Sequence, residues 1–476
     1  MVGVAFDPTE VQGNILRCYK TNLVRHVVVE ITNRDLARWF LGLAAQGGGE
    51  NVPAITRESH WHHKWRPGEK PKLCVNIGFT FAGLRAMGLA GNHLASFPTE
   101  FAQGMPARAR KLGDVGDSAP DTWTDAFRTP ARVHAMFSLH GADSDTIRRA
   151  TDQIGAAFGV LGWCDGRART DGSVFFRYKD GIGQPHLAHE DAQDLTQVTR
   201  HHSRGWQPED PLGTILLGHD TRFEDILFQI PSPDALGRNG TFNAFRMLAQ
   251  DCWGFEDFLT RAADDLERSD AGRILLPPGG EARIVDGHTR HAALREIVAA
   301  QMCGRWRDGV PYGVAPEGSR DFKDKSFDRF DYPAGSRCPV GSHIRRANPR
   351  GGAIVQRIAQ HTRRLVRRGM IYGPEMGDTR DTAERGLLGN FIGASLGAQF
   401  EAVMCDWINL GLQHPAITGT NDPLIGANAP ETDWFDLVLP GGGSFRLRGL
   451  PRFVTTRGGA YLFVPSLPAI THLARG

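Results

Sequence analysis

The chain has 476 residues, of which 55 are lysine or arginine and 53 are aspartate or glutamate, so its formal net charge is only +2. This nearly even balance gives no reason to expect a nucleic-acid partner. Hydrophobic residues make up 41% of the chain. A chain of this length and composition can bury one large core or, more typically, two moderate ones.

The N-terminus and the cysteines bear on the cellular compartment. The opening stretch MVGVAFDPTEVQGNIL lacks the basic and apolar regions of a signal peptide, and no segment is apolar for long enough to cross a bilayer. The 7 cysteines are scattered without a Cys-x-x-Cys pair, and an odd number argues against a closed disulfide framework. We therefore predict a cytoplasmic protein without membrane association, whose cysteines are reduced and mostly buried.

Strand and helix patterns alternate through the first part of the chain. A β-branched run at 23–32 predicts a strand, and 33–45 predicts the helix that follows it. Residues 72–89 predict a strand that turns into a helix, and 132–141 with 144–161 repeat strand and then helix. This order fits the β-α-β-β-α-β arrangement of a ferredoxin-like domain.

A second copy of this pattern begins after 187–211, a polar segment that we interpret as a linker. A strand is predicted to start at Thr214, and 242–266 is predicted to be an amphipathic helix or a strand followed by a helix. Residues 445–467 close the chain with two predicted strands. The Gly- and Pro-rich region 267–340, with one helix at ALREIVAAQMCGRW, indicates that this second domain carries insertions.

The stretch richest in chemistry runs from Cys338 to Pro374. It reads CPVGSHIRRANPR, then a short insert, then LVRRGMIYGP, so that one histidine, His343, lies among several arginines. A neutral imidazole is a good axial ligand for haem iron, and arginines suit both the haem carboxylates and an anion forming at the iron. A histidine beside arginines is also common on a solvated surface. The spacing alone leaves both interpretations open.

Sequence motifs across the chain resemble those of the dye-decolorizing peroxidase family. CPVGSHIRRANPR closely resembles the segment that carries that family's proximal haem histidine, and LVRRGMIYG resembles the segment that carries its distal arginine. VQGNILR, FTFAGLRAMGL, LGRNGTFNAFRMLAQD and FVTTRGGAYLFVPSL resemble segments of the longer, unsecreted members, so the resemblance covers nearly the whole chain. It implies one haem b (iron protoporphyrin IX), with His343 as the axial ligand of the iron and Arg367 as the distal arginine.

The resemblance also implies the fold. It is an α+β fold of two ferredoxin-like domains whose antiparallel sheets enclose a haem pocket, in agreement with the repeated β-α-β pattern. We expect an N-terminal domain at 1–210 that carries the distal aspartate and a C-terminal haem-binding domain at 211–476.

A second chemical centre lies in FFRYKDGIGQP, residues 175–185. An Asp-Gly pair is ordinarily a turn, but the family's Gly-x-x-Asp-Gly motif supplies the distal aspartate, and the aligned residue here is Asp180. The first glycine of the motif is replaced by Arg177. This departure keeps the acid–base residue and leaves two alternatives for Arg177, which either narrows the channel to the haem or points away from it.

Other residues were assigned supporting roles. Arg345 and Arg346 are expected to hold the haem propionates, the alternative being salt bridges to neighbouring acids. The family's acidic partner of the proximal histidine has no acidic counterpart at the aligned position, and Glu401 and Asp406 are the nearest acids. Tyr372 either passes electrons to bulky donors or packs with one hydrogen bond. The histidines of SHWHHKW are interpreted as solvated rather than metal-binding.

These features favour an enzyme. We expect a haem peroxidase that uses hydrogen peroxide to oxidise dyes, phenols and other small aromatic donors through a ferryl intermediate. The alternative is a haem-binding protein of the same fold, used in haem delivery or sensing, with weak peroxidase activity. A plain interaction scaffold is disfavoured because it would not require His343, Asp180 and Arg367 together. The sequence identifies no physiological donor and leaves homo-oligomer formation open.

Overall fold

The computed structural model describes most of the chain. The described residues are 6–58, 71–185, 187, 210–221, 227–284, 289–319, 330, 332, 335–350 and 363–476. Two expectations lie outside them, namely the histidines of SHWHHKW and most of the linker at 187–211.

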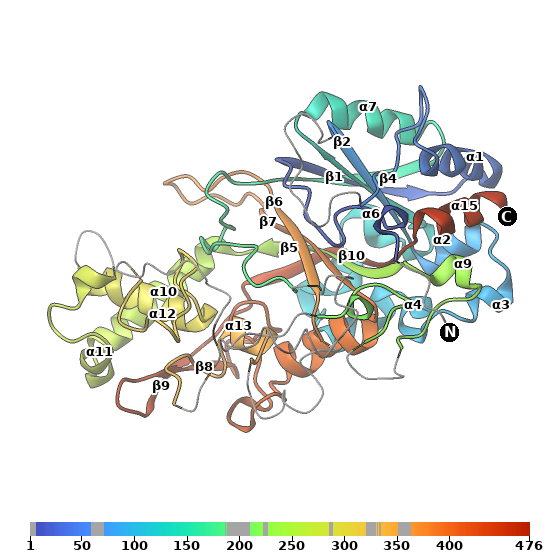
Figure 1. The fold of residues 1–476 in the computed structure, drawn as a ribbon. Coiled ribbons are helices and arrows are strands. Elements are labelled where there is room, and N and C mark those ends of the chain that lie inside the picture. The colour runs from blue at the N-terminus through green and yellow to red at the C-terminus, as the bar shows by residue number, and fades with distance from the viewer. Residues whose placement is uncertain are drawn as a thin grey trace.

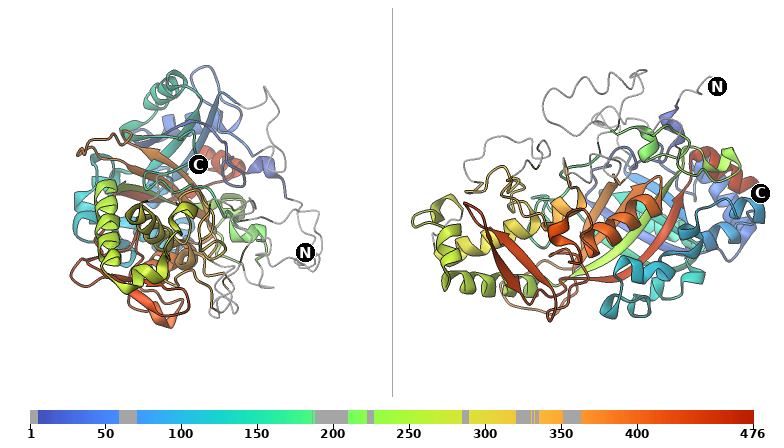
Figure 2. Two further views of the ribbon diagram at one scale, coloured as in Figure 1. Left: turned by 90° about the vertical axis from the view of Figure 1, so that its left-hand side faces the viewer. Right: turned by 90° about the horizontal axis from the view of Figure 1, so that it is seen from below.

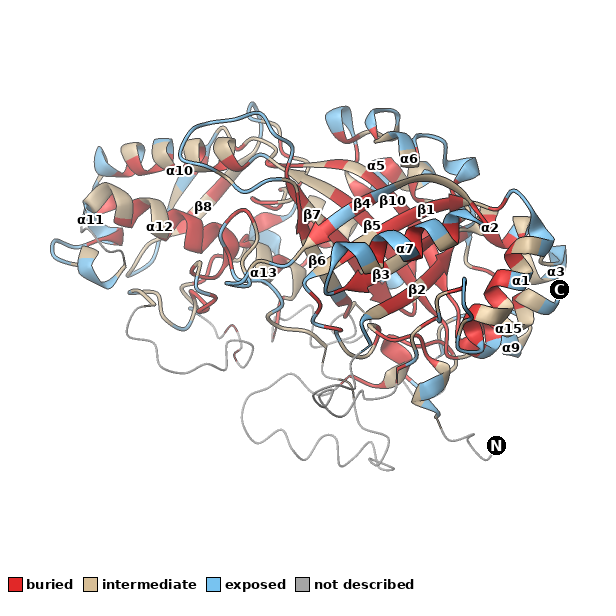
Figure 3. Ribbon diagram, turned by 90° about the horizontal axis from the view of Figure 1, so that it is seen from above, coloured by how far each residue is buried: buried red, intermediate tan, exposed pale blue. Residues whose placement is uncertain are grey.

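Within the described residues, antiparallel strands close into a barrel in the order β1-β3-β2-β10-β5-β7-β6-β4 (Figure 1). Figure 3 shows that these strands are largely buried. Their bounds are Leu23–Glu30 (β1), Leu73–Phe79 (β2), Ala135–Gly141 (β3), Gly159–Arg167 (β4), Thr241–Gln250 (β5), Val366–Tyr372 (β6), Gly386–Gly393 (β7) and Val454–Val464 (β10).

The barrel consists of two halves with the same internal topology. In the first half the strands lie in the order β4-β1-β3-β2, and in the second in the order β6-β7-β5-β10. Each half therefore places its first strand between its fourth and its third, as a β-α-β-β-α-β unit does. The halves meet at two short junctions, where Phe79 pairs with Phe463 and Arg167 pairs with Ile371. This confirms the α+β fold of two ferredoxin-like units. The exact boundary at 210 and 211 stays a prediction.

Helices cover the barrel, and local capping explains where the two main helices of the first half begin. In α1 (Arg34–Ala45) the Asn33 side chain accepts a hydrogen bond from the Leu36 amide, and in α7 (Ser144–Gly155) Asp143 does the same for Thr146. Shorter helices follow β2 and α15 ends the chain. Their bounds are Phe81–Ala86 (α2), Gly91–Leu94 (α3), Thr99–Gln103 (α4), Ala109–Leu112 (α5), Asp125–Arg128 (α6), Asp234–Gly237 (α9) and Leu467–Arg475 (α15).

An extension of the second half projects from one end of the barrel (Figures 1 and 2). It contains α10 (Cys252–Glu267), α11 (Asp270–Leu275), α12 (Arg290–Cys303) and the hairpin of β8 (Trp434–Val438) and β9 (Ser444–Arg448). Its buried side chains form a hydrophobic core separate from that of the barrel. The expectation that the second domain carries the insertions is therefore confirmed.

Residues 242–266 form a strand followed by a helix, the second of the two alternatives predicted for this segment, and Asp251 follows β5 and caps α10 through the Gly254 amide. The predicted elements differ from the structure in two places. The strand expected from Thr214 is wrong, since Leu212–Thr214 is one 3₁₀ turn and the chain folds back so that the Gly213 amide bonds Asp220 O at 3.1 Å. The helix α15 after the last strand was not predicted.

The structure contains no disulfide among the seven cysteines. All of the cysteines are free, and five of the seven are buried. None of the helices in the described ranges combines the length and the apolar composition needed to cross a membrane.

One buried acid of the barrel, Glu58, should make stability depend on pH. Its side chain is 4% exposed, and burial raises its pKa from 4.5 to about 7 against the opposing effect of the Arg17 amide. From about pH 4.5 to 7 the unfolded chain releases this proton while the folded chain retains it. The free energy of unfolding should therefore fall with rising pH, by on the order of 3 kcal/mol over this interval.

Denaturant unfolding at pH 5 and pH 7 measures this effect. Glu58→Gln carries no titrating group, so its unfolding free energy should change less between the two pH values than that of the parent. Equal pH dependence in both proteins would contradict the assignment.

Candidate active site

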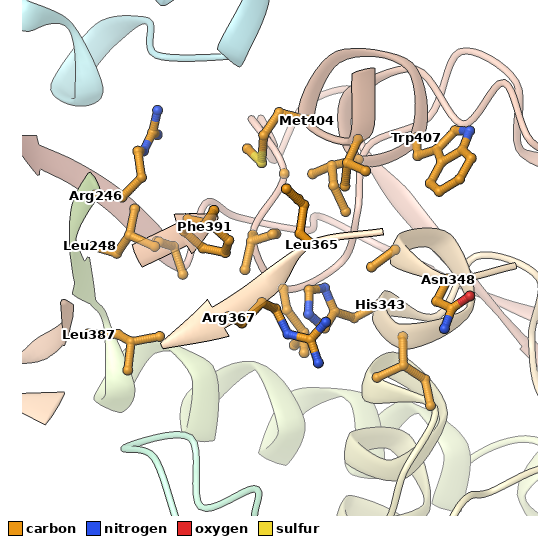
Figure 4. Close-up of a pocket in the computed structure, with 18 of the residues that line it drawn as sticks. Arg246, Leu248, His343, Asn348, Leu365, Arg367, Leu387, Phe391, Met404 and Trp407 are labelled. Carbon is orange, nitrogen blue, oxygen red and sulfur yellow. The ribbon is translucent and has the colours of Figure 1, made fainter. Parts of the chain in front are cut away.

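A cavity of about 340 Å³ lies between the second half of the barrel, the loop at 174–183 and the segments at 343–350 and 400–427, a volume within the usual range for small-molecule sites. Figure 4 shows side chains entering it from β5, β6, β7 and α13 (His343–Ala347). Much of the lining is apolar and includes Leu248, Leu365, Leu387, Phe391, Phe400, Met404 and Trp407. The charged lining includes Asp180, His343, Arg305, Arg350, Arg363, Arg364 and Arg367. An apolar cavity with a few convergent charged groups is the usual form of a cofactor site.

His343 begins α13 and reaches into this cavity (Figure 4). Its Nδ1 lies 3.0 Å from Oδ2 of Asp422, a carboxylate that is completely buried. The other oxygen of Asp422 accepts hydrogen bonds from the amides of Leu424 and Ile425 at 2.9 and 3.0 Å. An Nδ1–H donated to a carboxylate fixes the tautomer and leaves Nε2 as the free lone pair, which is how a metal-ligating histidine is commonly supported.

The acidic partner of His343 is thus Asp422, which the sequence analysis missed. Of the two acids expected there, Glu401 accepts hydrogen bonds from Arg108 and Tyr461, and Asp406 pairs with Arg363 at 2.8 Å. Burial disfavours the charged form of Asp422, but His343 lowers the pKa of this carboxyl overall. The carboxylate is therefore held ionised beside the imidazole.

The segment around Asp180 and the strand β6 meet at the same cavity. The Arg367 Nη2 donates hydrogen bonds to the carbonyls of Ile182 and Gly183 at 3.0 and 2.9 Å. The side chain of Gln184 bonds both the amide and the carbonyl of Arg367 at 3.0 and 3.1 Å. Burial lowers the pKa of Arg367 to about 10, while the Asp180 carboxylate raises it. The structure therefore brings Asp180 and Arg367 together, although 187 residues separate them in the numbering.

Arg177 is not among the residues that line the cavity, and its side chain is exposed. Its backbone has φ = +65°, a left-handed conformation that glycine adopts freely and other residues adopt at a cost. The motif glycine therefore suits the backbone of this turn, which arginine adopts at a cost. Its replacement leaves the lining of the cavity unchanged, which settles the two alternatives in favour of an outward side chain.

Arg177→Gly should remove the cost of this left-handed conformation. Relief of about 1–2 kcal/mol is partly offset by the greater freedom of glycine in the unfolded chain, so we expect the free energy of unfolding to rise by about 0.5–1 kcal/mol. Denaturant titration measures this, with Arg177→Ala as the control that keeps the strained backbone. A loss of stability in Arg177→Gly would contradict this account.

Arg345 and Arg346 do not reach the cavity lining, and the propionate role expected for them is not supported. Arg345 donates to the carbonyl of Cys338 and lies 4.5 Å from the ring centroid of Tyr332. Arg346 is 2% exposed and its donors are used by Gly341 O, Trp407 O and Thr420 O at 2.9–3.2 Å. These two arginines hold α13 against neighbouring segments of the same chain. The arginines that do line the cavity include Arg305, Arg350, Arg363 and Arg364.

Tyr372 lies at the end of β6, away from the cavity lining. Its side chain is buried, and its hydroxyl lies 3.1 Å from Oε1 of Glu384. This is the packed tyrosine with one hydrogen bond that the sequence analysis gave as the alternative to electron transfer.

In the described ranges, no group of three or more His, Cys, Asp or Glu side chains is arranged to hold a metal ion. The candidate ligand is a single histidine, as haem ligation requires.

Comparison with known proteins identifies the class. Residues 10–161 match the family model described as the DyP dimeric alpha+beta barrel domain. The chain is 27% identical to Peroxidase 2 of Mycetinis scorodonius, with 98% of this chain and 87% of that protein covered. It is 26% identical to the multifunctional dye peroxidase DyP2 of Amycolatopsis sp., with 98% and 95% covered.

Solved structures that resemble this one are also dye-decolorizing peroxidases. A dye-decolorizing peroxidase in complex with 2,6-dimethoxyphenol superposes with a TM-score of 0.77 at 25% identity, covering 98% of this chain and all of that one. A fungal DyP-type peroxidase from Auricularia auricula-judae gives a TM-score of 0.78 at 22% identity, which shows the shared fold. The fold and the site thus define a peroxidase on an α+β barrel. The matched domain, the relatives and the solved structures together support a dye-decolorizing (DyP-type) peroxidase, a class that is haem-dependent.

The residues at the cavity fit a haem. His343 has one ring nitrogen held by Asp422 and the other left for a metal, the walls are largely apolar, and several arginines face the same space. An iron ligand, an apolar surface for the macrocycle and cations for its carboxylates are the three requirements of such a group.

Proposed function

We propose that this peroxidase holds haem b through Nε2 of His343, reduces hydrogen peroxide and oxidises aromatic donors, with Asp180 and Arg367 as its catalytic residues. The observation that carries the proposal is that one cavity is lined by His343, with its buried Asp422 partner, and also by Asp180 and Arg367. When bound, the haem supplies the redox centre that links peroxide to the donor.

Asp180 is assigned the proton transfers. Heterolysis of peroxide requires one proton to leave the inner oxygen and one to reach the outer oxygen, and a single positioned carboxylate serves both steps in turn. Asp180 lines the cavity on a loop whose two sides are held by hydrogen bonds, through the Asp180 amide to Gly172 O at 3.0 Å and through Gln184 to β6. The carboxylate is therefore presented to the cavity from an ordered loop.

Arg367 is assigned the stabilisation of charge. A cation already in place beside the outer oxygen favours the negative charge that develops there as the O–O bond breaks. Arg367 keeps this cation at the cavity, because β6 fixes its backbone and the carbonyls of Ile182 and Gly183 orient its guanidinium.

The cavity lining indicates how the chain would hold the rest of the cofactor. The leucines, phenylalanines and Met404 would pack against the macrocycle and exclude water, and the haem carboxylates would be bound by cavity-lining arginines. The candidates for this role are Arg305, Arg350, Arg363 and Arg364. A guanidinium binds a carboxylate through two parallel hydrogen bonds, which suits this task.

We propose phenolic compounds and dyes as the donors, on the basis of what two similar proteins bind or are named for. One similar structure is a complex with 2,6-dimethoxyphenol, and one curated relative is named a multifunctional dye peroxidase. Seven free cysteines support a reducing, cytoplasmic compartment.

The alternative of a haem carrier rested on Arg177 and on the missing partner of His343. Arg177 points away from the cavity and Asp422 is that partner, so neither observation now favours a carrier.

The test is the visible spectrum of the purified protein before and after addition of hydrogen peroxide. We expect a Soret band at one haem per chain, a rapid spectral change with peroxide, and a return to the starting spectrum when 2,6-dimethoxyphenol is added. A haem-loaded protein whose spectrum does not respond to peroxide would overturn the peroxidase mechanism and favour the haem carrier.

A further inference from the structure

The loop that carries Asp180 is inserted into the core of the extension. The Phe176 ring lies 4.8 Å from that of Phe255 on α10, measured between centroids. The Tyr178 hydroxyl donates a 2.8 Å hydrogen bond to Ala299 O on α12. Both residues are buried in the hydrophobic core of the extension. The segment just before the catalytic aspartate is thus fixed by helices that lie outside the barrel.

Arg307, just after α12, joins this loop to the extension. Its guanidinium donates to the carbonyl of Phe176 at 2.7 Å, to both oxygens of Glu296 at 3.0–3.1 Å, and to Glu256 at 3.1 Å. The same group lies over the ring of Tyr178, 5.5 Å from its centroid. The Arg307 side chain is only 15% exposed, so these interactions are little screened by water.

We propose that Arg307 is a positioning residue for Asp180. It ties the carbonyl of Phe176 to two carboxylates of the extension and thereby sets the place of the acid–base carboxylate at the cavity. This inference rests on the proposed role of Asp180 in the peroxide reaction.

The geometry explains why an arginine serves here. A planar guanidinium offers five donors in a fixed fork, so one group can bind a carbonyl and two carboxylates at once. Three residues separate Phe176 from Asp180, and the turn that contains Phe176 is closed by the hydrogen bond from the Val174 amide to Tyr178 O at 3.0 Å. A shift of Phe176 would therefore be passed on to Asp180. A displacement of about 1 Å at a reacting group costs on the order of a hundredfold in rate.

Arg295 provides a matched control. It lies on α12 and donates to the other oxygen of the same Glu256 carboxylate at 2.6 Å. Removal of its charge weakens the ion-pair network of the extension, but its hydrogen bond joins two helices of the extension rather than the extension and the loop. Both variants lose a hydrogen bond to Glu256, whereas Arg307→Met also loses the contacts to Phe176, Glu296 and the Tyr178 ring.

The test measures the second-order rate constant with hydrogen peroxide in haem-loaded protein, together with amide exchange of the loop. We expect Arg307→Met to lower the rate constant ten- to hundredfold, Arg307→Lys to lower it about three- to tenfold because an ammonium lacks the fork, and Arg295→Met to change it less than about twofold. Amide hydrogen exchange at 172–183 should be about tenfold faster in Arg307→Met and unchanged in Arg295→Met.

A double-mutant cycle separates positioning from a general loss of structure. If Arg307 acts through Asp180, adding Arg307→Met to Asp180→Asn should change the rate constant less than about twofold. Equal effects in both backgrounds, or a parent-like rate in Arg307→Lys and Arg307→Met, would overturn the inference while the proposed function stands. An Asp180→Asn variant as fast as the parent would instead overturn the proposed role of Asp180.

Discussion

Asp180→Asn should slow the reaction with hydrogen peroxide by on the order of a hundredfold or more. The substitution keeps the size of the side chain and removes its ability to take up and return a proton. The acceptor is lost at the one carboxylate that lines the cavity from the loop bonded to Arg367. Arg367→Leu should give a loss of similar order, because it removes the cation that favours charge separation in the O–O bond.

Stopped-flow absorbance in the Soret region measures both rates. Asp171→Asn is a suitable control, since Asp171 is exposed on the same loop and caps the Ser173 amide without lining the cavity. It should react within about twofold of the parent rate. If haem-loaded Asp180→Asn and Arg367→Leu both react as fast as the parent, these residues take no part in the mechanism.

The fold was largely predictable because its information is local. Strand β1 is a β-branched run, α1 begins at an asparagine cap, and the strand–helix order repeats in both halves. The strand expected at Thr214 failed because a short apolar run does not distinguish a strand from a buried turn. Here the backbone of Ile215 and Leu217 pairs with Thr241 and Gly240 without forming a ladder.

Only the site residues that lie within a recognisable sequence motif could be predicted. Recognisable segments point to His343, Asp180 and Arg367 as candidates, and all three line one cavity. The partner of His343, in contrast, is 79 residues further along the chain. The Asn421-Asp422-Pro423 sequence reads as a turn, so only the tertiary structure shows that Asp422 is a buried partner of the imidazole.

The family context assigned the haem propionates to Arg345 and Arg346, which lie beside His343 in sequence but outside the cavity lining. On a helix, residues two apart do not share a face, so Arg345 in α13 points away from the side that His343 presents to the cavity. Arg346 is turned to backbone carbonyls that the sequence does not reveal. The sequence left two alternatives for Arg177, a narrower channel or an outward side chain, and it could not show that the backbone there has φ = +65°, which makes the replacement of glycine costly.

His343→Ala should abolish stable haem binding, since the cavity lining, as far as the structure describes it, offers no second imidazole to the iron and the apolar walls and arginines bind a macrocycle without fixing its metal. The Soret band of the purified variant, per mole of chain, should fall to a few per cent of that of the parent. A normal haem content and ferric spectrum would show that the ligand is another residue.

Asp422→Asn should have a milder effect than His343→Ala, because it keeps the imidazole and weakens only the hydrogen bond to its Nδ1. An asparagine oxygen still accepts the Nδ1–H, but without a negative charge the imidazole is less basic, and such changes typically cost ten- to a hundredfold in metal affinity or activity. We therefore expect haem to bind, to transfer to apomyoglobin faster than from the parent, and to have a higher reduction potential because the imidazole donates less electron density to the iron. Parent-like values of both quantities would show that the 3.0 Å contact between His343 and Asp422 orients the ring without tuning the ligand.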